Sequence, residues 1–180
     1  MIYFVRHGRT DDNEREAKGE VFKTSDLGLN ELGREQAGEL AEKLKEVKLD
    51  AVVTSPLKRA RETAEIINKY HGAPMEEEEG LAERKGVAAD MVLWHELFDF
   101  DKNLQVEGGE NLRDFFERVY AAIERIRAKY EGKDILVTSS GGVNHVFRAY
   151  FNNLEWKGNM RVDRMRNCDV REYDFGKVMR

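Results

Sequence analysis

The sequence predicts an α/β fold of three layers, in which a mostly parallel central sheet carries helices on both faces. Short, largely apolar runs at 2–5, 50–54 and 135–138 have the length and continuity of strands that are buried on both sides. Segments with helical spacing of apolar residues separate these runs, and this β, α, β, α order is typical of parallel sheets. The 180 residues contain no repeat and no low-complexity linker, so we expect a single domain over residues 1–180.

The first strand is predicted at residues 1–6, and a loop rich in Asp, Asn, Gly and Lys is expected to follow it as far as Leu29. Asn30 is a suitable N-cap, because its side chain can accept hydrogen bonds from the free N–H groups of a first helical turn. The apolar residues of the helix that follows share one face, as in a helix packed against a sheet. They are Leu32, Ala37, Leu40, Leu44 and Val47.

The second strand is predicted at residues 50–54. Ser55-Pro56 then opens a second helix, since proline is favoured in the first helical turn. Its small and apolar residues Ala60, Ala64 and Ile67 are expected to face the sheet.

The segment 71–110 is the least regular part of the chain. The acidic run Glu76 to Glu79 is interpreted as a solvated surface turn. The apolar side chains after it are expected to pack over the edge of the sheet, and a lid over the site is the alternative. They are Trp94, Leu97, Phe98 and Phe100.

The C-terminal third returns to the alternating pattern. Asn111 precedes a long helix with apolar residues at helical spacing, and Gly132 is expected to end it. A strand is predicted at 135–138, and Gly141-Gly142 turns the chain into a further helix. Residues 169–175 alternate in polarity, which favours a last, antiparallel edge strand.

The composition favours a folded enzyme over a nucleic-acid-binding or membrane protein. Hydrophobic residues make up 41% and charged residues 36% of the chain, and the formal net charge is -5, with bases and acids interspersed. No apolar stretch reaches the length of a membrane span, and the N-terminus lacks a signal-type segment, so a cytoplasmic location is expected. Cys168 is the one cysteine, which excludes a disulfide framework and leaves a packing role for its side chain.

The motif Arg6-His7-Gly8 stands at the carboxyl end of the first predicted strand, where ligands collect in open α/β sheets. A neutral imidazole is a nucleophile, and a hydrogen bond from one ring nitrogen to a backbone carbonyl would fix the tautomer that attacks. Arg6 and Arg59 offer forked donors to phosphoryl oxygens, and the Gly141-Gly142 turn offers backbone N–H groups to an anion. The alternatives are a structural histidine at a strand end and an ordinary helix-surface arginine at position 59.

Several motifs together resemble the histidine phosphatase superfamily, also called the phosphoglycerate mutase-like family, over almost the whole chain. The motifs that carry this resemblance are Arg6-His7-Gly8, Asn13, Asp26 to Ala37, Ser55 to Thr63, Glu83 and Gly108-Gly109-Glu110-Asn111. The resemblance implies a phosphoglycerate mutase-like fold and a phosphohistidine intermediate on His7. Arg6 and Arg59 would be catalytic with His7, and Glu83 would protonate the leaving alkoxide and then activate water. The residues implied to bind the substrate are Arg6, Asn13, Arg59, Ser140 and Gly141.

The chain departs from the family pattern at one position. Where the family carries a second catalytic histidine, the sequence reads Thr138-Ser139-Ser140-Gly141-Gly142. Serine donates a hydrogen bond but carries no positive charge, so Ser140 is expected to impair catalysis. His145 lies about a turn further on and is interpreted as a helix residue, not as a substitute.

The resemblance favours an acid phosphatase-like phosphomonoesterase. Little chain separates Glu83 from Gly108, so the long insertion of the family's mutases, which closes the site against water, does not fit here. Two alternatives stay open: a mutase-type phosphotransferase, and a non-catalytic phosphoester-binding protein on the same fold. Arg84-Lys85 is a further candidate contact for an acidic substrate group. A serine hydrolase is disfavoured because Thr138 stands where a Gly-x-Ser-x-Gly turn needs glycine. A small phosphorylated substrate is expected without metal or cofactor, and a homodimer stays open.

Overall fold

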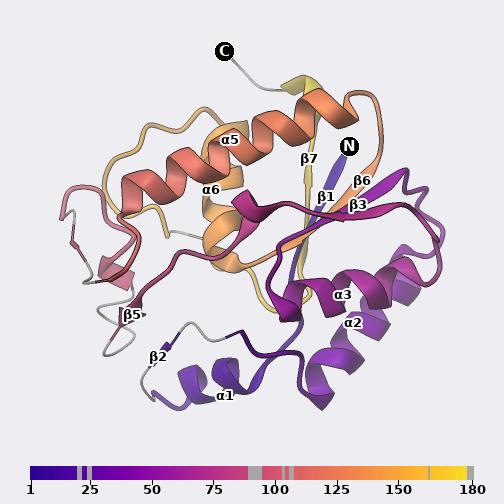
Figure 1. The fold of residues 1–180 in the computed structure, drawn as a ribbon, viewed down its shortest axis with the longest axis horizontal. Coiled ribbons are helices and arrows are strands. Elements are labelled where there is room, and N and C mark those ends of the chain that lie inside the picture. Colours follow the sequence, from indigo (N-terminus) through magenta and orange to yellow (C-terminus); the bar gives the residue numbers. More distant parts are fainter. Residues whose placement is uncertain are drawn as a thin grey trace.

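The computed structural model describes residues 1–19, 22–23, 26–88, 95–102, 104–105, 108–161 and 163–177. Its central sheet has the strand order β4-β3-β6-β1-β7 (Figure 1). These strands are β1 (Ile2–Arg6), β3 (Ala51–Thr54), β4 (Met75–Glu77), β6 (Ile135–Ser139) and β7 (Val170–Tyr173). A separate antiparallel pair joins β2 (Phe22–Lys23) to β5 (Val87–Ala88).

The sheet is parallel except at one edge. Strand β6 pairs in parallel with both β1 and β3, and β3 pairs in parallel with β4. Strand β7 runs antiparallel to β1 at the sheet edge, so the prediction of a last antiparallel edge strand is confirmed.

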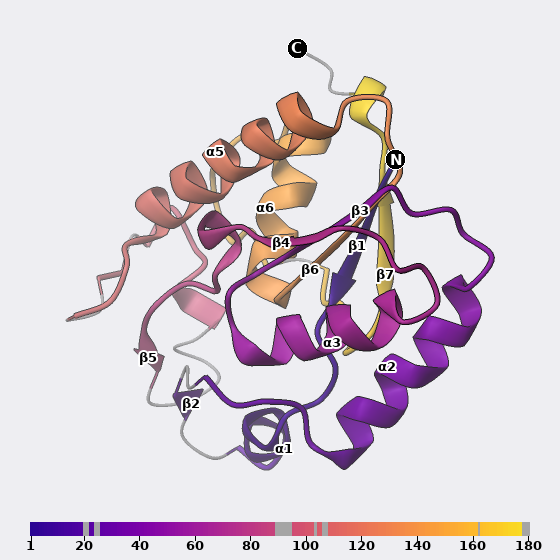
Figure 2. The same cartoon turned by 45° about the vertical axis from the view of Figure 1, so that its right-hand side comes forward.

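Helices cover both faces of the sheet, as Figure 2 shows. The helices are α1 (Asp11–Ala17), α2 (Glu31–Leu44), α3 (Lys58–Asn68), α5 (Leu112–Tyr130) and α6 (Gly141–Phe151), with short 3-10 turns η1 (Glu79–Leu81) and η2 (Phe175–Lys177). Helices α5 and α6 pack on the face that presents Phe4, Val53 and Val137. Helices α2 and α3 pack on the opposite face, against Val5 and Val52. The predicted three-layer α/β fold is therefore confirmed.

The predicted helix starts are correct at two asparagines. The side chains of Asn30 and Asn111 accept hydrogen bonds from Gly33 N and Asp114 N, and so cap α2 and α5. The face predicted for α2 is only partly right, because Leu32 is 40% exposed and Val47 lies beyond the helix end. Helix α3 begins at Lys58, two residues after Pro56, because Ser55 and Pro56 form a turn before Leu57, its N-cap.

Two segments differ from their predicted structure. The predicted loop at 7–29 contains α1, which begins with a capping box between Thr10 and Asn13. The predicted surface turn at 76–79 instead supplies β4, an edge strand beside β3. Its Glu76 pairs with Lys129 of α5, and its Glu77 pairs with Arg61 of α3.

The apolar residues of the middle segment are structural. Leu97 and Phe98 are buried in the core with α5 and α6, and Phe100 packs against Phe116 and Trp156. These contacts support the packing interpretation over a lid. Trp94 lies outside the described residues.

The carboxyl ends of three parallel strands bring the chemical side chains together. His7 follows β1 and donates its backbone N–H to Ser139 O of β6 at 2.8 Å. Ser55 follows β3 and donates its N–H to Thr138 O at 2.9 Å. The residues after β1, β3 and β6 therefore lie side by side at the edge where open α/β sheets bind ligands.

Candidate active site

His7 is buried at the end of β1 with both ring nitrogens engaged. Its Nδ1 lies 2.8 Å from Gly8 O, and its Nε2 lies 3.1 Å from the Nε of Arg59. Since a carbonyl only accepts and a guanidinium only donates, Nδ1 carries the proton and Nε2 presents its lone pair. The tautomer predicted for a nucleophilic histidine is therefore the one these contacts favour.

The surroundings of His7 keep it neutral. Burial and the positive charges of Arg59 and Arg6 hold the pKa of His7 well below its usual range, and the hydrogen bond to Gly8 O opposes this only in part. An imidazole with a lowered pKa stays unprotonated at neutral pH. Its Nε2 therefore keeps a lone pair, which accepts the hydrogen bond from Nε of Arg59 in this structure.

Arg59 is held in place from the start of α3. Its side chain is buried, and its backbone carbonyl accepts a hydrogen bond from the hydroxyl of Thr63 at 2.7 Å. The same hydroxyl accepts the N–H of Gly8 at 3.0 Å. Thr63 therefore ties α3 to the backbone beside His7, which explains why Arg59 and Thr63 occur together in one motif.

Helix α2 supports the same loop from the other side. Asn30 N donates to Arg9 O at 3.0 Å, and Gln36 accepts the N–H of Arg9 at 3.1 Å. A Cβ at Gly33 would lie 2.0 Å from Arg9 O, so only glycine permits this approach. The Asp26 to Ala37 motif is thus a support for the residues after His7.

Arg6 lies at the N-terminus of α6. Its Nη1 donates to Met165 O at 2.6 Å, and its Nε lies 3.6 Å from where a Cβ on Gly141 would stand. The free N–H groups of a helix N-terminus attract anions, and a guanidinium beside them adds a full positive charge. The structure therefore places the Arg6 guanidinium beside the N-terminus of α6, an arrangement that suits an anion.

Glu83 reaches the same corner from the segment after η1. Its carboxylate accepts the N–H of Gly142 at 3.2 Å and the N–H of Arg84 at 2.8 Å. It lies within electrostatic reach of both Arg6 and Arg59, whose own pKa values burial lowers. The structure thus brings Glu83 close to Arg6 and Arg59, and Arg59 contacts His7.

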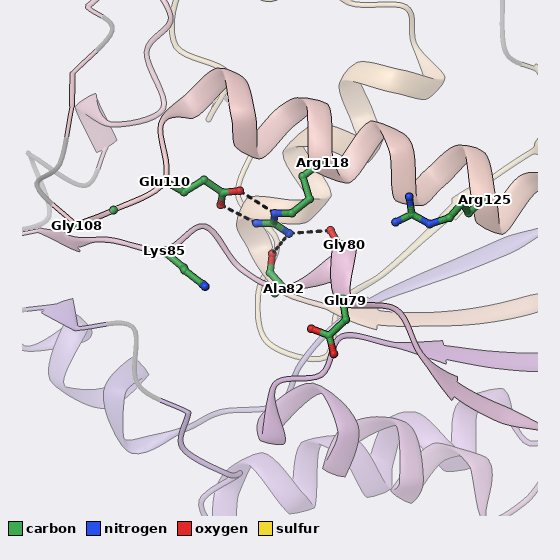
Figure 3. A pocket seen from close by; sticks show the side chains of 9 residues that line it. Glu79, Gly80, Ala82, Lys85, Gly108, Glu110, Arg118 and Arg125 are labelled. Atoms are coloured by element: carbon green, nitrogen blue, oxygen red, sulfur yellow. Dashed lines mark hydrogen bonds and ion pairs between the residues drawn. The ribbon is translucent and has the colours of Figure 1, made fainter.

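An ion pair that the sequence did not reveal holds the backbone that carries Glu83. Arg118 of α5 binds Glu110 through two hydrogen bonds of 2.7 Å and donates to Gly80 O and Ala82 O (Figure 3). These residues line a cleft of about 600 Å³, into which Lys85 also faces. The motif at 108–111 therefore helps to hold the backbone beside Glu83, the candidate general acid.

Arg84 also binds Glu110 and helps to hold this segment in place, and it is not a substrate contact. Its side chain is almost fully buried, where it donates to Glu110 O at 2.9 Å and to Leu97 O. The expectation that Arg84 could touch an acidic substrate group is wrong, because these carbonyls and the ring of Phe98 enclose its guanidinium.

Ser140 occupies the N-cap of α6 without capping it. Its hydroxyl is buried and has no hydrogen-bond partner among the described residues. His145 lies inside α6 with its ring edge-on to Phe98, and burial lowers its pKa to about 3. It is a helix residue, as predicted, and it is buried and neutral.

Asn13 reaches the site through a second asparagine. Its Oδ1 accepts the N–H of Thr10 at 3.2 Å and the amide of Asn167 at 3.1 Å. Asn167 also donates to His7 O at 2.9 Å. Asn167 stands 160 residues after His7, and no motif in the sequence marked it.

The sequence also matches a family of known proteins. The model of the histidine phosphatase superfamily, branch 1, matches residues 2–178. The chain belongs to this superfamily. Among the described residues of this superfamily member, no group of three or more His, Cys, Asp or Glu side chains could hold a metal ion.

Relatives agree with this assignment, and a solved structure shares the fold. The chain is 34% identical to the uncharacterized phosphatase PhoE of Bacillus subtilis over 146 residues, which is 80% of this chain and 73% of PhoE. It is 37% identical to phosphoglycerate mutase-like protein 4 of Arabidopsis thaliana over 158 residues, 79% of this chain and 66% of that protein. The structure of a mycobacterial glucosyl-3-phosphoglycerate phosphatase with VO3 matches 98% of this chain and 94% of that chain, with a TM-score of 0.79 at 21% identity, and shows the same fold.

The superfamily supports phosphatase-type activity for this member. Its described helices include none that is both long and apolar enough to cross a membrane. The comparisons thus agree with the fold and the class of reaction predicted from the motifs.

Proposed function

We propose that the protein is a phosphomonoester hydrolase that forms a phosphohistidine on Nε2 of His7. The observation that carries this proposal is the neutral, buried imidazole whose Nε2 lone pair is directed at the guanidinium of Arg59. Nε2 attacks phosphorus, the ester P–O bond breaks, and the leaving alkoxide takes a proton from Glu83. Water then attacks phosphorus, Glu83 accepts its proton, and orthophosphate leaves with the bond electrons returning to Nε2.

The rest of the site stabilises the charge that collects on the phosphoryl oxygens. Arg6 and Arg59 supply forked cationic donors, and the Gly141 N–H lies at the N-terminus of α6. The amide oxygen of Asn13 already accepts two hydrogen bonds, so Asn13 offers its NH₂ group to a substrate. Ser140 offers a neutral hydroxyl. The mechanism needs no metal or cofactor, and we propose that it operates in a single cytoplasmic domain.

The proposal is tested by measuring orthophosphate release from a panel of alkyl and aryl phosphate monoesters. In a second experiment, the protein is mixed with radiolabelled substrate and the reaction is quenched rapidly without acid, so that label bound to the protein can be measured. We expect label on the protein that survives alkali and is lost in acid, as a phosphoramidate should be. Label stable in acid would contradict a histidine nucleophile. Binding of vanadate without any turnover would favour the non-catalytic alternative.

A mutase-type transfer is the second candidate, and the name of the Arabidopsis relative supports it. The two reactions differ in the phosphoryl acceptor, which is water in one and an alcohol in the other. Adding a second alcohol, such as glycerol, to the assay separates them. Orthophosphate as the main product supports hydrolysis, whereas phosphorylated glycerol as the main product supports transfer.

Gly142→Ala is expected to lower kcat for an alkyl phosphate by about 10². A Cβ at Gly142 would stand 2.1 Å from Oε1 and 2.8 Å from Cδ of Glu83, so the carboxylate must leave the N-terminus of α6. We expect a much smaller loss for p-nitrophenyl phosphate, because its leaving group needs little protonation. This difference between substrates is the readout that a merely structural change would not produce.

Gly38→Ala is the matched control for this variant. Gly38 also lies in a helix, and a Cβ there would meet no atom within 4 Å. The control should retain wild-type kcat for both substrates. Equal losses for both substrates in Gly142→Ala would contradict the placement of Glu83 as the proton donor.

A further inference from the structure

A short segment between α6 and β7 is fixed against the end of β1, next to the candidate active site. The backbone N–H of Arg6 donates to Asp169 O at 3.2 Å, and the N–H of Cys168 donates to Arg6 O at 2.9 Å. The guanidinium of Arg6 donates to Met165 O at 2.6 Å. These contacts hold the segment beside the end of β1, and Asn167 lies between them in the chain.

The backbone of this segment forms a turn with an uncommon conformation. The carboxylate of Asp169 accepts the N–H of Arg166 at 2.6 Å, and the N–H of Asp169 donates to Arg166 O at 3.1 Å. Cys168 has a φ of 57°, in the left-handed region that residues other than glycine rarely adopt. Such conformations persist where the surrounding contacts compensate for them, and they cluster at functional sites. The position directly after Asn167 therefore indicates a functional role for this turn.

The side-chain NH₂ group of Asn167 has two acceptors in the site. Its Nδ2 lies 2.9 Å from His7 O and 3.1 Å from Oδ1 of Asn13. An amide NH₂ group carries two hydrogens, so it can serve both acceptors at once. Asn167 therefore links the backbone of the candidate nucleophile to the side chain of Asn13, which is a candidate ligand of the phosphoryl group.

The bond to His7 anchors Asn167 more than it holds His7. The N–H of His7 already donates to Ser139 O at 2.8 Å. The imidazole ring is held by Gly8 O at 2.8 Å and by Nε of Arg59 at 3.1 Å. Removal of the Asn167 amide leaves these three contacts in place. We therefore expect the position of the nucleophile to depend little on Asn167.

Asn13, in contrast, depends on Asn167 for the direction of its amide. Its Oδ1 accepts two hydrogen bonds, one from the N–H of Thr10 at 3.2 Å and one from Asn167 at 3.1 Å. Turning the Asn13 amide by 180° would place its own NH₂ group against both donors, so the two bonds together oppose that orientation. Without Asn167, only Thr10 opposes it. The turned amide would present its oxygen to an anionic phosphoryl group, and two acceptors repel each other.

From these contacts we infer that Asn167 is a positioning residue, which holds the side-chain amide of Asn13 with its NH₂ group toward the phosphoryl group of the substrate. The inference rests on the proposed hydrolase function and adds to it a residue from the segment between α6 and β7. The effect of Asn167 on the reaction passes through Asn13. A residue that acts only through another loses its effect once the other side chain is removed.

A double-mutant cycle with p-nitrophenyl phosphate as the probe tests this inference. Asn167→Leu keeps about the volume of the side chain and removes its donor. In the wild-type background we expect it to lower kcat/KM about tenfold, and by no more than Asn13→Ala does, because one hydrogen bond to an anion is lost. In the Asn13→Ala background, the same substitution should change kcat/KM by less than about twofold.

Asn68→Leu is the matched control. Nδ2 of Asn68 also donates to a backbone carbonyl, Ala73 O at 2.9 Å, but it lies at the C-terminal end of α3, whereas the site lies at the N-terminal end. The control should leave kcat/KM unchanged in both backgrounds. Asn167→Ala repeats the cycle with a smaller side chain, which separates loss of the donor from an effect of leucine itself. Thermal unfolding of every variant reports whether the fold survives.

Failure of the inference and failure of the hydrolase function give different results. Equal losses from Asn167→Leu in the two backgrounds, or no loss in the wild-type background, overturn the inference while hydrolysis stands. Loss of the fold in both Asn167 variants also overturns it, because the residue is then structural. Absence of orthophosphate release by the wild type contradicts the proposed function. In that case the same cycle, measured as vanadate affinity by calorimetry, decides the inference: equal losses of affinity in the two backgrounds overturn it, and absence of vanadate binding to the wild type overturns both.

Discussion

His7→Ala is expected to lower kcat for phosphate-monoester hydrolysis by about 10⁴- to 10⁶-fold, the range found when a covalent nucleophile is removed from an enzyme. Alanine has no lone pair where Nε2 stands 3.1 Å from Arg59 Nε. The remaining arginines can still bind a phosphoryl group, so we expect vanadate affinity to change far less than kcat. Steady-state orthophosphate release and vanadate binding measure the two quantities.

His71→Ala serves as the control for the loss of a histidine. His71 lies after the C-terminal end of α3, whereas Arg59 and the site lie at its N-terminal end. The control should keep wild-type activity and a protein-bound label. A label that persists in His7→Ala would place the nucleophile on another residue, and thermal unfolding of both variants confirms that the fold survives.

The parts of the fold that the sequence predicted depend on neighbouring residues. Apolar runs mark β1, β3 and β6, and the caps Asn30 and Asn111 bind N–H groups three residues away. Such contacts are local, and their spacing is visible in the sequence. The strands also fixed the place of His7, because parallel strands end at the same edge.

The parts that could not be predicted depend on contacts between distant residues. Helix α1 has only 7 residues and few apolar positions, so periodicity did not mark it. Strand β4 is acidic, and its side chains become acceptable in a strand because α5 supplies Lys129 to Glu76 and α3 supplies Arg61 to Glu77. The ion pair between Glu110 and Arg118 can hold the backbone before Glu83 only when α5 is packed beside η1 in the folded chain.

The candidate site likewise contains residues that the sequence predicted and residues that it did not. The motif residues were found because each belongs to a pattern, and the geometry brings Arg6, His7, Arg59 and Glu83 together. Asn167 belongs to no pattern, and it reaches the site from a segment without regular structure. Only the folded chain brings it within hydrogen-bond distance of His7 O.

Ser140→His is expected to raise kcat/KM for a generic phosphate monoester by about 10² to 10³, the range associated with one preorganised donor in a transition state. The serine hydroxyl is buried without a partner among the described residues, beside the Gly141 N–H. An imidazolium there would add a positive charge where negative charge develops. Orthophosphate release by the two proteins, measured side by side, tests this.

A larger side chain at position 140 could raise the rate through its positive charge or only through an added contact with the substrate, and a neutral variant separates the two. Ser140→Asn is the control, since an amide donates hydrogen bonds and fills space but stays neutral. It should gain little, whereas the imidazole variant should gain most below the pKa of the introduced group and lose its advantage as pH rises through that pKa. The N-terminus of α6 opposes a cation and Glu83 favours one, so the pKa of the introduced group depends on both. No gain at any pH, in a variant that unfolds at the wild-type temperature, would mean that Ser140 does not limit the reaction and that the arginines already neutralise the transferring phosphoryl group.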